Sequence, residues 1–195
     1  DLSGEMPLSF KEFLTVFPKI TPPYLVADTN ISKAADTTAI GYKALKQFFP
    51  DSVLQPLVGN SKKTLIHPVG IIEKGKENYL VVSITNAKKN IRLLVLVTDK
   101  KNNYLASKEL LNSPYDDGYL HSVSINREPT FLISKEKMGS DNSMRFSRTG
   151  WVYASTGEFM VVINDSNEDP IKSAIINPID TLSKKNKLSG DYVQD

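Results

Sequence analysis

Apolar residues in the first 60 positions are spaced as in short helices. Over residues 10–17 they recur at intervals of three and four, which places them on one helical face. Ser9 and Glu12 have the spacing of a capping box, in which each side chain accepts a hydrogen bond from the other residue's backbone N–H. A second helix is predicted over residues 36–49, and Pro50 is expected to end it because proline cannot continue a helical hydrogen-bond ladder.

The pattern changes near residue 64 to apolar runs separated by clusters of Gly, Asn and Lys. The turn centres fall near residues 75, 88 and 101, a spacing of 13 that is typical of antiparallel hairpins. The run from Leu93 to Val97 contains no polar residue, so both faces of this strand must be covered. More strands are expected after residue 119, with separate ones at 144–148 and 151–155.

Together these elements predict an α+β fold, an antiparallel β-meander of about eight strands with two short N-terminal helices packed on it. The length of 195 residues suits a single domain. We divide it into a helical part (1–60), a β-rich part (64–176) and a polar tail (177–195), and we expect the natural polypeptide to continue beyond Asp195. The strand pattern leaves open whether the strands form one curved sheet or two.

Charge is unevenly distributed along the chain. Lys plus Arg against Asp plus Glu is 5 to 6 in residues 1–60, 10 to 4 in 61–115 and 9 to 12 in 116–195, so the net charges are −1, +6 and −3. The lysines of the basic third come mostly in pairs between apolar runs, and we interpret them as turn residues divided between two ends of a sheet. A nucleic-acid site needs one contiguous basic surface, so we expect no nucleic-acid partner.

The residues that catalysis or metal binding would need are sparse. The chain has no cysteine and two histidines, His67 and His121, which we interpret as structural because neither lies in a metal-binding motif. Residues 165–169 match the first oxygen-ligand positions of an EF-hand loop, but Pro170 and Ile176 stand where a glycine and a glutamate are required. We therefore predict no catalytic residue, no metal site and no cofactor.

One aromatic set is a candidate for ligand binding. Trp151 and Tyr153 occupy alternate positions of a predicted strand, so their side chains point the same way, and Phe159 follows nearby. If that face is open, the rings form a ligand platform; if it is closed, they belong to the core. The leading function is therefore a non-enzymatic binding or scaffold domain with an unknown ligand or protein partner. The alternative is a hydrolase of glycans or peptides that uses paired carboxylates on adjacent strands.

Two stretches of the chain, residues 10–24 (FKEFLTVFPKITPPY) and 177–192 (NPIDTLSKKNKLSGDY), resemble uncharacterised exported lipoproteins of Bacteroidetes-type bacteria. The resemblance implies an extracytoplasmic location, in the periplasm or at the cell surface. It also implies a lipidated cysteine before the mature domain, so that membrane contact would be made only through an anchor absent from this sequence. The family supplies no catalytic residues that can be assigned here.

Overall fold

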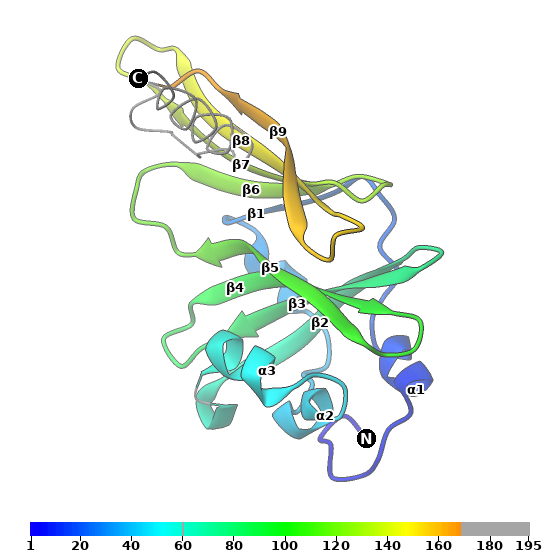
Figure 1. The fold of residues 1–195 in the computed structure, drawn as a ribbon. Helices are drawn as coiled ribbons and strands as arrows, with labels where there is room; N and C mark the ends of the chain where they lie inside the picture. The colour runs from blue at the N-terminus through cyan, green and yellow to red at the C-terminus, as the bar shows by residue number, and fades with distance from the viewer. Residues whose placement is uncertain (60, 169–195) are drawn as a thin grey trace, which may run out of the picture.

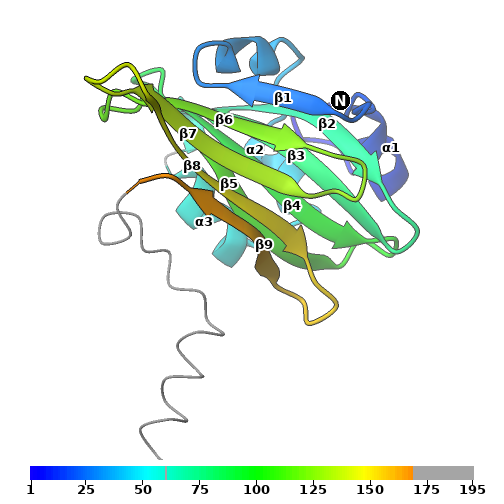
Figure 2. The same cartoon turned by 90° about the horizontal axis from the view of Figure 1, so that it is seen from above.

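A computed structural model describes residues 1–59 and 61–168. In these described residues, nine strands form two antiparallel sheets, A and B, that lie one above the other (Figure 1). The short helices lie on the face of sheet A that points away from sheet B. Sheet A has the order β2 (Leu65–Glu73), β3 (Glu77–Thr85), β4 (Ile91–Asp99) and β5 (Tyr104–Ser113). Sheet B has the order β1 (Tyr24–Ala27), β6 (Leu120–Ile125), β7 (Phe131–Met138), β8 (Met144–Tyr153) and β9 (Phe159–Ser166), seen from above in Figure 2.

The helices are short. They are α1 (Phe10–Thr15), α2 (Tyr42–Lys46) and α3 (Asp51–Val58), with 3₁₀ turns at Ile31–Ala35 and Ser61–Lys63. Among the described residues, no helix has the length and apolar character needed to cross a bilayer.

Sheet A separates two hydrophobic cores. On one face, Leu94 belongs to a cluster with Phe13 of α1 and Phe49, which lies between α2 and α3. On the other face, Val95 belongs to a second cluster that includes Val123 and other residues of sheet B. Both Leu94 and Val95 are 0% exposed, so the apolar run of β4 is buried on its two sides.

The predicted capping box at the first helix is confirmed. The backbone N–H of Glu12 donates to Ser9 Oγ at 3.2 Å, and the backbone N–H of Ser9 donates to Glu12 Oε2 at 2.8 Å. These bonds satisfy two N–H groups that would otherwise lack partners at the helix N-terminus. The bond from the Ser9 N–H also holds the pKa of the Glu12 carboxyl below its usual value.

Removing the cap should weaken the fold measurably. Ser9→Ala is expected to lower the free energy of unfolding by about 0.5–2 kcal/mol, because an N–H at the helix end loses its acceptor. Urea denaturation followed by circular dichroism measures this loss. Ser52→Ala, at an exposed serine of α3 that forms no such bond, is the matched control and should be nearly neutral. Equal stabilities of the two variants would contradict the structural role of the cap.

The predicted helix over residues 36–49 is wrong in its extent. Ile40 is extended instead, because its N–H donates to the carbonyl of Ile66 at 2.7 Å and the chain pairs briefly with the edge of β2. The helical part begins only at Tyr42. Pro50 does not end the segment but stands directly before α3, where its missing N–H and fixed φ suit a helix start.

The strands differ in two details from the expectation. The described residues form nine strands in two sheets, and the short β1, which lies in the part expected to be helical, was not predicted. The strands expected at 144–148 and 151–155 are one strand, β8. Gly150 lies at its middle, where a Cβ atom would come within 2.8 Å of the Ile163 side chain on β9, so glycine allows the two strands to approach. The lysine-bearing turns between the strands of sheet A lie alternately at its two ends.

Candidate ligand-binding site

The inner face of sheet B changes from apolar to basic along β7. Phe131 is fully buried against sheet A, and Ile133 packs on the same inter-sheet core. Because side chains two residues apart share a face of a strand, the next positions on this face are Lys135 and Lys137. Lys137 is exposed. The core therefore ends within β7, and the strand continues as one wall of a polar cavity.

This cavity has a volume of about 690 Å³, within the usual range for small-molecule sites. Its walls come from β7, β8, the loop between them, the residue before β6 and the residues after β9. We call it the basic cavity, and it is lined by Tyr119, Lys135, Lys137, Asp141, Ser143, Arg145, Asn167 and Glu168.

Three cations are gathered in the basic cavity. Lys137 and Arg145 are direct cross-strand partners on β7 and β8, an arrangement in which like charges repel. In the described part of the chain, neither residue forms an ion pair, and neither does Lys135. The ammonium groups of Lys135 and Lys137 lie 4.7 and 5.1 Å from the centroid of the Tyr119 ring. The ring stabilises these charges by cation–π attraction but does not neutralise them.

The same cavity also contains hydrogen-bond acceptors. The Tyr119 hydroxyl donates to the Glu168 carboxylate, and this bond raises the pKa of the phenol, which stays protonated at neutral pH. Asp141 Oδ1 accepts from the Ser143 hydroxyl at 2.6 Å and from the Ser143 N–H at 3.0 Å, which lowers the pKa of the Asp141 carboxyl. The carboxyl oxygens of Asp141 and Glu168 are thus hydrogen-bond acceptors in the same cavity as the three cations.

Tyr119 packs against an aromatic cluster formed by His121 and Tyr115. The His121 ring stacks on Tyr115 with centroids 3.4 Å apart and planes 7° from parallel, and it meets Tyr119 edge-on at 6.4 Å. His121 Nε2 lies 2.7 Å from Asp117 Oδ2, and the Tyr119 N–H donates to the other oxygen of Asp117 at 3.0 Å. His121 thus fixes the position of Tyr119 by packing.

The other polar residues singled out in the sequence lie elsewhere. His67 stands opposite Ser83 in the β2–β3 pair, and burial lowers its pKa. Neither histidine belongs to a group of three or more potential His, Asp or Glu metal ligands within the described residues. In the loop considered for calcium, the Asn167 amide accepts from the Phe146 N–H and donates to the Met144 carbonyl, which joins the chain after β9 to β8. Asp169, the last acidic residue of that loop, lies outside the described residues.

Trp151 and Tyr153 lie on the inner face of sheet B, where both pack against the inter-sheet core and are half-buried. The Lys108 ammonium lies 3.5 Å from the centroid of the Trp151 ring, so one face of the indole is already occupied. Tyr153 meets Phe159 edge-on at 6.0 Å. Neither residue lines the basic cavity, and their role in ligand binding stays a prediction.

The residues of the basic cavity were missed because net charges were summed over long segments. Residues 116–195 are acidic in total, which hides three cations that strand pairing brings together. The alternation of Ile133, Lys135 and Lys137 was the available signal. It indicates that one face of a strand leaves the core.

Comparison with known proteins adds no constraint to this geometry. No family model matches the chain, and no curated protein or solved structure is significantly similar to it.

Proposed function

We propose that this chain is a non-enzymatic binding domain that works outside the cytoplasm and holds an acidic sugar in the basic cavity. The observation that carries the proposal is that Lys137 lies directly opposite Arg145, so that the two like charges repel each other, and that neither forms an ion pair with a carboxylate in the described part of the chain. Such repulsion costs stability unless an anion is bound. The extracytoplasmic location is supported by the resemblance of residues 10–24 and 177–192 to exported lipoproteins.

The mixture of groups in the cavity supports a ligand that carries hydroxyls beside its negative charge. A bare anion such as phosphate would be attracted by the lysines and the arginine but would also meet the carboxylates of Asp141 and Glu168. Sugar hydroxyls, in contrast, can donate to these carboxylates while a carboxylate or sulfate group binds the cations. The Ser143 hydroxyl and the Tyr119 phenol add further polar partners.

A hydrolytic mechanism with paired carboxylates finds weaker support. Glu77 and Asp99 are direct cross-strand partners on β3 and β4. Asp99, however, accepts from the amide and the N–H of Asn103 and from the N–H of Lys101, and these bonds lower the pKa of its carboxyl. A carboxyl that stays ionised in this way could act only as the nucleophile or base, so the general acid would have to be Glu77. Neither Glu77 nor Asp99 lines the basic cavity.

Calorimetric titration with D-glucuronate tests the proposal. We expect binding that weakens by about tenfold or more in the double variant K137Q/R145Q, since charge-assisted hydrogen bonds are lost. The variant K76Q/K88Q removes the same amount of charge at exposed turn positions and should bind like the wild type. D-glucose, which lacks the charge, and acetate, which lacks the hydroxyls, should each bind more weakly.

The outcomes separate the parts of the proposal. Binding of acetate as tight as that of glucuronate would retain the anion site but overturn the sugar ligand. Equal affinities of K137Q/R145Q and K76Q/K88Q would overturn the site itself. Release of reducing ends from an acidic oligosaccharide during prolonged incubation would overturn the non-enzymatic assignment.

A further inference from the structure

A second cavity, of about 360 Å³, lies at the edge of the sandwich where the segment after α1 crosses β2. We call it the inter-sheet cleft. It is lined by Lys19, Ile20, Thr21, Pro22, Ile71, Ile72, Glu73, Lys74 and Arg127. Lys74 follows β2 of sheet A and Arg127 lies in the turn between β6 and β7 of sheet B, so both sheets contribute to this cleft.

The apolar side of the cleft is built by a close approach of two backbones. The Ile20 N–H donates to the Ile71 carbonyl at 3.0 Å, and the Ile71 N–H donates to the Pro18 carbonyl at 2.9 Å. Gly70 makes this possible, because a Cβ atom there would lie 2.4 Å from the Ile20 side chain. The wall is therefore fixed by the fold and does not depend on a loop closing over a ligand.

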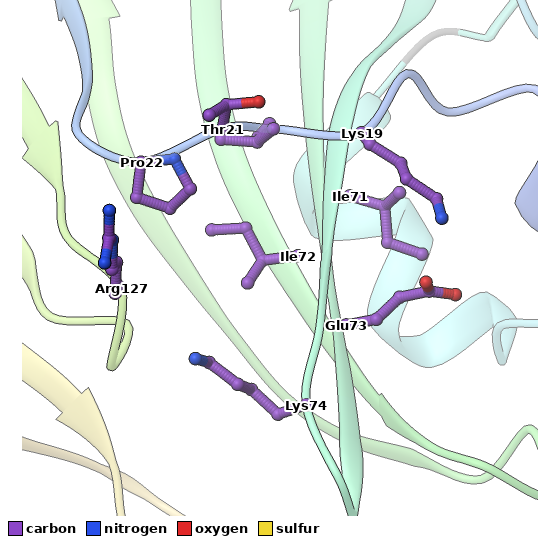
Figure 3. A pocket seen from close by; sticks show the side chains of 9 residues that line it. Lys19, Thr21, Pro22, Ile71, Ile72, Glu73, Lys74 and Arg127 are labelled. Atoms are coloured by element: carbon purple, nitrogen blue, oxygen red, sulfur yellow. The ribbon is translucent and has the colours of Figure 1, made fainter.

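The charged groups of the cleft are divided between its two sides. Figure 3 shows Ile72 and Pro22 at the centre, with Lys74 and Arg127 reaching in from one side. The charged ends of Lys19 and Glu73 turn to the other side. Within the described residues, Lys74 and Arg127 form no ion pair. One side of an apolar cleft thus carries two cations without a counter-charge.

We propose that the inter-sheet cleft binds a small carboxylic acid with an apolar chain. The apolar chain of the ligand would contact Ile20, Ile72 and Pro22, and burial of its surface would favour binding. The carboxylate would accept hydrogen bonds from Lys74 and, in bidentate geometry, from the Arg127 guanidinium. This site is separate from the basic cavity, and none of its lining residues is shared with it.

Titration of the full chain with octanoate tests this site. The affinity should fall by about tenfold or more in K74Q/R127Q. It should be unchanged in K76Q/K88Q, the matched charge control. Octanol, which has the alkyl chain without the charge, and acetate, which has the charge without the long alkyl chain, should each bind more weakly than octanoate.

Several results would overturn the inference. One is the absence of octanoate binding to the wild type, and another is an affinity that K74Q/R127Q leaves unchanged. A third is octanol binding as tightly as octanoate. If K137Q/R145Q loses octanoate binding and K74Q/R127Q does not, the carboxylate binds in the basic cavity. That result would retain the anion site of the proposed function while removing the second site.

Discussion

Replacing Phe131 by alanine is expected to lower the free energy of unfolding by about 3–5 kcal/mol. Phe131 begins β7, is 0% exposed and packs between Tyr79 of sheet A and Phe159 of sheet B, with ring centroids 6.0 Å from each. Its removal leaves a cavity in the layer that holds the two sheets together. Because Lys135 and Lys137 lie further along the same strand, the basic cavity depends on this packing.

Phe146→Ala is the matched control for Phe131→Ala. Phe146 lies on the opposite face of sheet B and is half-buried, with the Arg148 guanidinium over its ring at 4.4 Å. We expect it to lose less than about 1 kcal/mol, in line with a surface position. Chemical denaturation of both variants gives the comparison. Losses of equal size would contradict the assignment of the inter-sheet core to the face that carries Phe131.

Leu94→Ala and Val95→Ala, made separately, are both expected to destabilise the protein. Leu94→Ala should cost about 2–5 kcal/mol, because the loss of a buried leucine leaves a cavity in the core between sheet A and the helices. Val95→Ala should cost about 2 kcal/mol, since it removes two methyl groups from the inter-sheet core at about 0.8 kcal/mol each plus a cavity contribution.

The two losses are measured by denaturation in urea and compared with the loss in Lys11→Ala, an exposed position of α1 that should be nearly neutral. If only one face of sheet A were covered, either Leu94→Ala or Val95→Ala would leave the free energy of unfolding nearly unchanged. Such a result would contradict the cover of sheet A by the helices on one face or by sheet B on the other.

Local signals in the sequence predicted the elements whose structure depends on neighbouring residues. The capping box needs only Ser9 and Glu12, and it forms as expected. The unbroken apolar run of β4 required cover on both faces, and both faces are buried. The turns near residues 75, 88 and 101 were recognisable because Gly, Asn and Lys interrupt apolar runs there.

Elements that depend on distant partners were not predictable in this way. The extended conformation at Ile40 is stabilised by a hydrogen bond to Ile66, a contact that helical spacing in residues 36–49 does not reveal. The strand β1 is only four residues long and exists because it pairs with β6. Continuity of β8 through Gly150 likewise depends on the neighbouring β9, on which Ile163 fills the space above the glycine.

The candidate site was hidden for the same reason. Lys137 and Arg145 are separated by a loop in the sequence, and only the register of β7 and β8 places them opposite each other. Tyr119 reaches the same cavity because β6 pairs with β7. Trp151 and Tyr153 were correctly expected to share a face, but the structure places both against the inter-sheet core.

A nuclear magnetic resonance titration of the ¹⁵N-labelled chain with D-glucuronate locates the binding site of an acidic sugar residue by residue. If the sugar binds in the basic cavity, we expect the largest chemical-shift changes at the backbone amides of Tyr119, Lys135, Lys137 and Arg145, while those of Ile72 and Arg127 stay unchanged. Absence of shifts at concentrations that saturate weak sugar sites, or shifts centred away from β7 and β8, would contradict binding of the sugar in this cavity.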